Sequence, residues 1–591
     1  MLNACIICHK KKVKCDLASQ HPCSNCIKSD VDCIRYKRKR KRYTNSLSPR
    51  DSRAELYTPP IPPSPQCRAQ ESPQLTITGD GSKPEHAIQT YRARDRYLGR
   101  HVSFNESMIT ANAAKRDCSL TDIDVQLLTQ QGAYTLPPPD VQNELVAIFM
   151  RFGYIWTPIV DPSWLSGQPV SYLLLQSLFV AASRMTRQPN RHASSAEFYR
   201  RAKLLFFFGN ERDPIILIAS AILLHWYNPV GPETISTDTS GFWLRTAEAI
   251  AFQIGLHKEP PLHEKHRGLR RRLWWTLVLR DCIIAAGVGR PRTINLSDSD
   301  VLPPSLDDFA VPDINARIFI VYVPICQFLG EIVENCLRPQ LPPNQRALEN
   351  CLYRWVKQDL PSIQPPQSTG SLETRQVMVM YFVTIIIIDR APTTDGVPSA
   401  RSLIASSFIS GMFRIFLEND ELCRLGAAFT FYALCAGLAL IPAYRFLPLR
   451  AVANEETLVL KASLQVLSQQ WGSAFGSLRA LQRLTDDVAN QPIFDKRLPH
   501  LTDDVLPFFE NFDWKICRLR EMLLDSNVYE PSSVNPQPSI PSTVGQGGPF
   551  ATSQTGRQEP FEIPSDELDM FIGNWEGLGF DWSGSWLLES M

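Results

Sequence analysis

The amino-acid sequence predicts a protein with two folded parts, a small metal-stabilised module in residues 1–43 and a large all-α domain in residues 136–525. Two observations lead to this fold class. Six cysteines lie within the first 33 residues in two copies of one spacing, and thiolates at such a spacing are typical metal ligands. From residue 136 onward, apolar residues recur at helical intervals, and alternating strand patterns are scarce.

Two further segments have the composition of disordered chain. Residues 44–105 are rich in proline and serine and predict an extended linker, and residues 526–591 form a tail rich in proline, serine and glycine. The formal net charge of the 591 residues is only +1, but it is unevenly spread. The N-terminus is strongly basic, whereas residues 559–591 contain acidic residues and no lysine or arginine. This asymmetry favours a nucleic-acid binder with a protein-binding end.

The cysteine repeats predict a centre of two metal ions. Each Cys-x2-Cys-x6-Cys repeat offers three sulfurs, whereas a tetrahedral metal ion needs four, so two ions can share six sulfurs if two thiolates bridge. A disulfide knot would need an oxidising compartment, and residues 1–12 lack the apolar core of a secretory signal. The expected ligands are Cys5, Cys8, Cys15, Cys23, Cys26 and Cys33.

The two repeats carry opposite charge, which assigns them different roles. Lysines occupy the first repeat, whereas Asp30 and Asp32 take the aligned positions in the second and would be repelled by phosphate. A lysine-rich helix can neutralise phosphates and donate to guanine in the major groove, although such a run can also be a merely solvated face. A basic run follows Cys33 and predicts further phosphate contacts and nuclear import. The expected DNA-binding residues are Lys10, Lys11, Lys12, Lys14, Lys37, Arg38 and Arg40.

With both repeats and Pro22 in the loop between them, the N-terminal segment resembles the fungal Zn2Cys6 binuclear-cluster DNA-binding domain. The resemblance implies two bound Zn²⁺ ions, with Cys5 and Cys23 as the bridging ligands. It also implies double-stranded DNA as the partner, with Lys11 and Lys12 at the bases of CGG-type triplets. Many such proteins dimerise through a coiled coil after the cluster. The prolines of residues 44–105 forbid a long helix, so a homodimer would use other surfaces.

The helical region resembles the fungal-specific transcription factor domain, or middle homology region, and its cutinase transcription factor subgroup. The segments that carry this resemblance are 152–161, 247–257 and 270–281, followed by Gly289-Arg290-Pro291, Asp300 and the segment 381–392. We expect helices at 242–254, 269–286, 428–440 and 458–467. The apolar runs 377–388 and 215–226 are too short to span a bilayer, so we expect buried helices and no membrane partner.

Within this region the sequence shows no pattern that predicts catalysis. We expect Trp274 and Trp275 to lie in the core, and Arg280 and Asp281 to form ion pairs with neighbouring helices. The chain contains neither a phosphate-cradling glycine loop nor a serine nucleophile elbow, and its histidines form no metal-binding pattern. We therefore expect no catalytic residues and no enzymatic activity.

The end of the tail has the composition of an activation segment. Acidic residues are interleaved with the large apolar side chains Phe571, Trp575, Phe580 and Trp582. The acids keep such a segment soluble, and the aromatic side chains can then bury in a groove of a transcriptional coactivator. Alternatively, the tail docks on the helical domain of its own chain.

Together these features predict a nuclear, zinc-dependent, sequence-specific transcription factor for RNA polymerase II, acting as an activator. The alternative keeps the zinc module but makes the helical domain the functional centre, as a ligand-sensing or partner-binding repressor.

Overall fold

The structure is a computed structural model, and it describes residues 8, 15–16, 20–29, 33, 97, 120–166, 170–186, 192–337, 345–389, 397–494 and 498–524. The chain divides into two compact units, Met1–Pro73 and Gln74–Met591. The described part of the chain contains α-helices and short 3₁₀ and π turns but no β-strand, which confirms the helical fold class.

The first unit contains helix α2 (Ser24–Lys28). The α-helices of the second unit are α4 (Asp122–Gln130), α5 (Pro139–Ile148), α6 (Ser163–Ser166), α7 (Tyr172–Ser183), α8 (Ser195–Phe207), α9 (Pro214–Leu224), α10 (Ser240–Gln253), α11 (Arg267–Val288), α12 (Ile314–Leu337), α13 (Gln345–Arg354), α14 (Leu372–Ile388), α15 (Ala400–Glu418), α16 (Ala428–Leu440), α17 (Leu447–Leu467), α18 (Ser473–Ala489) and α19 (Arg520–Leu524). The short turns are η2 (Phe149–Gly153), η4 (Leu296–Asp298), η5 (Leu306–Asp308), η6 (Trp355–Asp359), η7 (Leu360–Ser362), η8 (Leu422–Arg424), η9 (Ile441–Arg445), η10 (Leu506–Phe508) and η11 (Trp514–Ile516).

The helices predicted from apolar periodicity are all present. Helix α10 ends just before Gly255, whose φ of +66° is the left-handed conformation of a helix C-terminus. Helix α16 has the predicted bounds, and α11 extends two residues beyond the prediction at each end. Helix α17 begins at Leu447, eleven residues before the predicted start at Leu458, with Pro448 in its first turn.

Helix α4 lies before the predicted start of the helical domain. Its apolar side chains gave little signal, because Ile123 and Leu127 are exposed and Leu128 is the one buried residue of the helix. A reciprocal capping box between Thr121 and Asp124 sets its first turn instead. That local pattern is the signal in the sequence that could have marked this helix.

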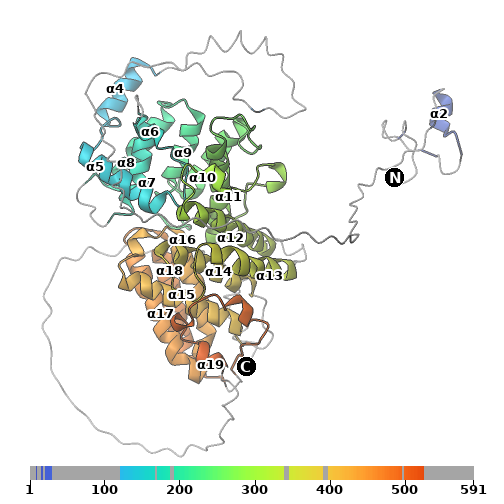
Figure 1. The fold of residues 1–591 in the computed structure, drawn as a ribbon, viewed down its shortest axis with the longest axis vertical. Coiled ribbons are helices and arrows are strands. Elements are labelled where there is room, and N and C mark those ends of the chain that lie inside the picture. Colours follow the sequence, from blue (N-terminus) through green and yellow to red (C-terminus); the bar gives the residue numbers. More distant parts are fainter. Residues whose placement is uncertain are drawn as a thin grey trace, which may run out of the picture. The chain divides into compact units, whose positions relative to one another are not determined.

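The helices of the second unit form two groups, with four central helices between them. Figure 1 shows α5–α10 in one half and α15, α17 and α18 in the other, with α11, α12, α14 and α16 between them. Helix α11 packs against α10, α12 and α16, and α14 packs against α12, α15 and α16. The side chains of Trp274 and Trp275 are 1 % and 5 % exposed, so their predicted place in the core is confirmed.

Phe509, near the end of the described residues, packs against this core. Phe509 lies parallel to Phe382 of α14 and Phe408 of α15, with ring centroids 6.0 and 5.8 Å away. Phe382 and Phe408 stack on each other at 4.8 Å. Burial of three aromatic rings contributes several kcal/mol to the packing of these elements.

Of the described residues, three helical stretches are long and apolar enough to cross a membrane: Ile314–Asn335, Ala400–Glu418 and Ala428–Arg445. The predicted buried helices α9 and α14 are shorter than these three stretches. In the three longer stretches, 67 %, 67 % and 83 % of the most apolar window is buried inside the protein. Their apolar side chains are therefore used mainly in contacts with other helices.

Asp281 forms the ion pair expected from the sequence. Its Oδ1 accepts a hydrogen bond from Nη1 of Arg245 on α10 at 2.8 Å, and its Oδ2 accepts from the backbone N–H groups of Thr293 and Ile294, each at 2.9 Å. The neighbouring carboxyl of Glu248 accepts from the Thr293 hydroxyl at 2.6 Å. Burial raises the pKa of Glu248 to about 7, although the Thr293 hydroxyl and Arg245 favour its ionised form. This network joins α10 and α11 to the segment after α11.

For Arg280, the expectation of an ion pair is wrong within the part of the chain that the structure describes. No described carboxylate pairs with its guanidinium, which donates instead from Nη2 to the backbone oxygen of Trp156 at 3.3 Å. Its Cζ lies 5.7 Å from the centre of the Trp226 ring. Arg280 and Asp281 point to different neighbours because adjacent helical residues differ by about 100° around the axis.

Candidate metal centre and nucleic-acid interface

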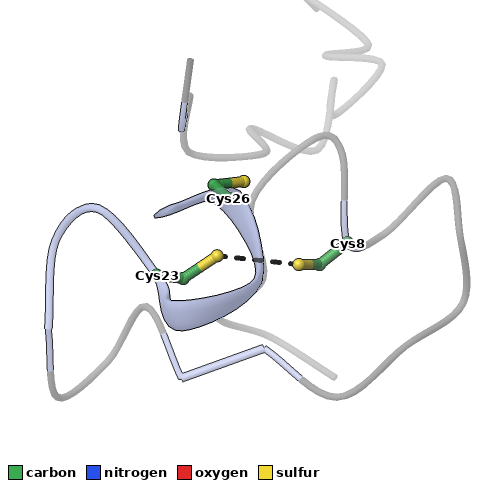
Figure 2. Close-up of side chains that lie close together, drawn as sticks. All are labelled: Cys8, Cys23 and Cys26. Atoms are coloured by element: carbon green, nitrogen blue, oxygen red, sulfur yellow. Dashed lines mark hydrogen bonds between the residues drawn. The ribbon is translucent and has the colours of Figure 1, made fainter. Parts of the chain in front are cut away.

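Three of the predicted thiol ligands come together in the first unit. The Sγ atoms of Cys8, Cys23 and Cys26 all lie within 4.8 Å of one another, and all three residues are buried (Figure 2). The Sγ atoms of Cys8 and Cys23 are 3.6 Å apart. A disulfide would hold them at about 2.05 Å, whereas two sulfurs on one tetrahedral zinc at about 2.3 Å from the metal lie about 3.8 Å apart. The separation therefore fits two ligands of one metal ion.

The two repeats contribute to the same cluster. Cys8 belongs to the first repeat, and Cys23 and Cys26 belong to the second. Cys33 is also buried, and Cys15 packs against the group. Cys5, the remaining predicted ligand, lies outside the described residues. Thiols from both repeats thus surround a common space, as a shared pair of metal ions requires.

Local structure around α2 sets the positions of the second-repeat thiols. Cys23 is the N-cap of α2, and the Cys26 N–H donates to its backbone oxygen at 3.0 Å, which places the two sulfurs one turn apart. The side chain of Asp16 accepts from the Ser24 N–H at 2.9 Å and from the Ser24 hydroxyl. These two hydrogen bonds lower the pKa of Asp16. Asp16 directly follows Cys15, so this contact ties the end of the first repeat to the start of the second.

The sequence analysis did not predict the contact between Asp16 and Ser24. A carboxylate beside the third cysteine and a serine beside the fourth are common surface residues, and only the fold shows that they meet. A short polar side chain at the start of a helix was the one available signal.

The thiols also receive hydrogen bonds that suit their ionised form. The Cys23 backbone N–H donates to Sγ of Cys33 at 3.3 Å, and the Asn25 amide lies 3.7 Å from Sγ of Cys8. Burial opposes ionisation of Cys23, but hydrogen bonds from Cys26 and contacts with the Cys8 and Cys33 thiols outweigh it, and the pKa of Cys23 is lowered. Zinc binds the thiolate, so this environment favours metal binding. All of the predicted ligand atoms are cysteine sulfurs, which suits a site that holds two zinc ions.

The predicted DNA-contact and activation residues remain predictions. Lys10, Lys11, Lys12, Lys14, Lys37, Arg38 and Arg40 lie outside the described residues, as do Phe571, Trp575, Phe580 and Trp582. Asp30 and Asp32, expected on the side of the module away from DNA, also lie outside them.

Comparison with protein families finds a known domain in each of the two folded parts of the chain. Residues 3–43 match the fungal Zn(2)-Cys(6) binuclear cluster domain, which binds two zinc ions through six cysteines, and residues 154–364 match the fungal specific transcription factor domain. A domain of the first kind implies binding to DNA. No solved structure matches the chain.

Curated relatives carry the names of transcription regulators. The chain is 27 % identical to cutinase transcription factor 1 alpha of Fusarium vanettenii over 538 residues, covering 74 % of this chain and 58 % of that protein. It is 25 % identical to the acetamidase regulatory protein of Aspergillus oryzae, covering 82 % of this chain and 78 % of that protein. The acetamidase regulatory protein of Aspergillus fumigatus is 27 % identical, with 56 % of this chain and 55 % of that protein covered. The chain thus spans little more than half of two of these three relatives.

The order of the two matched domains is the one expected from the sequence, with the cluster first and the helical domain behind it. The cutinase transcription factor among the relatives also agrees with the expected subgroup. The chain therefore carries a fungal Zn(2)-Cys(6) binuclear cluster domain at residues 3–43 and matches the fungal specific transcription factor domain over residues 154–364.

Proposed function

We propose that this protein is a nuclear regulator of RNA polymerase II transcription that binds double-stranded DNA through residues 1–43 and activates a pathway-specific set of genes. The observation that supports it most directly is the convergence of Cys8, Cys23 and Cys26, because it brings thiols of both repeats within 4.8 Å, as a binuclear zinc cluster needs. The names of the relatives point to transcription regulation as well. The proposal includes no catalytic step.

In this proposal the first repeat reads the DNA. Zinc holds the lysine-bearing segment after Cys8 in the major groove, where Lys11 and Lys12 donate to O6 and N7 of guanine in CGG-type triplets. Lys37, Arg38 and Arg40 bind phosphates, and the run that contains them serves as the nuclear import signal. A homodimer that does not use a coiled coil would bind two such triplets.

The test of DNA recognition separates base contacts from phosphate contacts. Selection of DNA sequences by the full chain should recover CGG-type triplets. Lys12→Ala should weaken binding by about 1–3 kcal/mol and relax the preference at one guanine. Arg38→Ala should weaken binding to all sequences alike and reduce the slope of log K against log salt by about one.

Lys515→Ala is the matched control, because Lys515 is an exposed lysine of the other unit. It should leave affinity, sequence preference and salt slope unchanged. Identical behaviour of Lys12→Ala and Arg38→Ala on every sequence would contradict the assignment of these two residues to different roles.

The tail would supply activation through its aromatic side chains. Residues 559–591 fused to an unrelated DNA-binding domain should activate a reporter gene. The double change Trp575→Ala and Trp582→Ala should abolish this activity, whereas Glu576→Gln should only reduce it, because the apolar groups supply affinity and the acids mainly solubility and encounter rate. An inert fusion, or full-length output that rises when the tail is deleted, would favour the repressor or a tail docked on its own chain.

A further inference from the structure

A small cavity lies among the central helices of the second unit. Its volume is about 80 Å³. Its walls come from segments far apart in the sequence, including α11, α12, α14 and α16, the end of α9 and the turn before α18. Its walls include the side chains of Trp156, Trp226, Arg280, Tyr322, Tyr432 and Trp471, together with the polar side chains of His225, Ser240 and Gln376.

The walls are largely aromatic and rigidly packed. The rings of Trp156 and Tyr322 meet edge to face at 5.0 Å, and those of Trp226 and Trp471 lie 6.4 Å apart. Trp226, Trp471 and Tyr432 are 5 %, 1 % and 1 % exposed. Such a surface favours the apolar part of a small ligand.

Arg280 places an uncompensated positive charge at this cavity. Two buried arginines of the unit have carboxylate partners: Arg271 pairs with Glu259 and Asp308, and Arg375 pairs with Glu421. The other buried arginines, Arg184, Arg272 and Arg445, donate instead to backbone oxygens. Within the described part of the chain, Arg280 has only the Trp156 backbone oxygen, the Trp226 ring and the polar groups of Tyr322, Tyr432 and Cys326 nearby. Arg280 is partly buried, and its Nε is shielded from solvent. A shielded charge without an opposite charge is unfavourable, so an anion at this position would be favoured.

Of the two neighbouring basic groups, only one adds positive charge near the cavity. His225 lines the cavity, but burial together with the charge of Arg280 holds its pKa well below the usual range, so it carries no positive charge at pH 7. A second arginine, Arg184, lies behind the wall, with its Cζ 4.1 Å from the centre of the Trp471 ring.

Several buried hydrogen-bond donors at this cavity have no acceptor among the described protein groups. Among the described protein groups, Nε1 of Trp156, Nε1 of Trp226, Nε of Arg280 and the hydroxyl of Tyr432 are buried and have no hydrogen-bond partner. All four can donate, and three of them can only donate. Buried donors normally have acceptors, so the set matches a ligand rich in acceptor oxygens.

We propose that this cavity binds a short aliphatic carboxylate, with its carboxylate against Arg280 and its hydrocarbon part against Trp226 and Trp471. About 10–15 Å³ of such volume holds one water-sized group, so 80 Å³ accommodates a ligand of about five to eight non-hydrogen atoms. Because the walls belong to both halves of the unit, the bound carboxylate stabilises their packing and so gives the helical domain a means of sensing. This inference adds a sensor to the proposed function and does not rest on DNA binding.

The test uses the full-length zinc-loaded protein with sodium butyrate as the probe and butyramide as its uncharged counterpart. Butyrate should raise the melting temperature of the helical domain and bind in calorimetry, whereas butyramide and inorganic phosphate should not. Arg280→Met should weaken butyrate binding about 10–100-fold, the loss expected for a charged hydrogen-bond partner. The same variant should melt no lower than the parent in the absence of butyrate, because it removes a charge with no opposite charge beside it.

Arg317→Met is the matched control, since Arg317 is an exposed arginine on α12, and it should bind butyrate like the parent. Arg280→Lys keeps the positive charge but loses the planar set of guanidinium donors, so it should weaken butyrate binding about tenfold. This variant tests the proposal if Arg280→Met does not fold. Absence of any butyrate effect, an equal effect of butyramide, or unchanged butyrate binding by the Arg280 variants would overturn the proposal. DNA binding measured on the same samples separates such a failure from a failure of the proposed function.

Discussion

Replacing Cys23 by serine should release both zinc ions and abolish specific DNA binding. Cys23 is the first cysteine of the second repeat, and its Sγ lies 3.6 Å from that of Cys8 in the first repeat and within 4.8 Å of that of Cys26. A structural zinc ion in a small module contributes about 10–16 kcal/mol to folding, far more than so short a segment gains from apolar burial. Metal analysis of the purified variant should find well under one zinc per chain, and specific DNA binding should fall by about three orders of magnitude or more.

Cys423→Ser provides the control, because Cys423 is a partly exposed thiol of the helical unit. It should retain two zinc ions and normal DNA binding. If Cys23→Ser kept one zinc ion and bound its DNA site normally, the two repeats would hold separate metals and the shared cluster would be wrong.

Replacing Asp281 by alanine should destabilise the helical unit by about 3–5 kcal/mol, the range for breaking a buried ion pair at one partner. The substitution removes the acceptor of the Thr293 and Ile294 N–H groups and one carboxylate partner of Arg245. The segment after α11 would then lose these hydrogen bonds to α11, and α10 and α11 would lose the ion pair between Arg245 and Asp281. Urea unfolding followed by tryptophan fluorescence should show a lower midpoint.

Asp307→Ala should change the unfolding free energy by no more than about 0.5 kcal/mol, because the Asp307 side chain is exposed. Asp281→Asn should cost less than Asp281→Ala but still destabilise, since an amide offers one acceptor oxygen where the carboxylate offers two. An unchanged urea midpoint for Asp281→Ala would show that the network does not hold this segment.

Local patterns predicted the parts of the molecule that depend on neighbouring residues. The spacing of the cysteines predicted ligands that include Cys8, Cys23 and Cys26, which lie within 4.8 Å of one another, and the apolar period around Ala428–Leu440 predicted α16 with its correct bounds. Helix α4 was missed because it buries a single side chain, Leu128, so a period-based argument finds little there.

Features that depend on distant parts of the chain could not be predicted in this way. Asp16 and Ser24 meet only in the folded metal module, so the sequence alone does not reveal their contact. Arg280 was expected to have a carboxylate partner. Its actual surroundings are built from residues such as Trp156, Tyr432 and Trp471, which are separated by more than a hundred positions from it in the chain.

The packing of α11 against α16 and of α12 against α14 has a practical consequence for how this protein is cut into pieces. The match to the fungal specific transcription factor domain stops at residue 364, before α14. A fragment ending there would leave the faces of α11 and α12 that meet α14 and α16 open to water, and it would also lack the ring stack that Phe509 completes. The matched stretch is thus only part of the packed helical unit. Soluble expression of the helical region requires the chain through about residue 524.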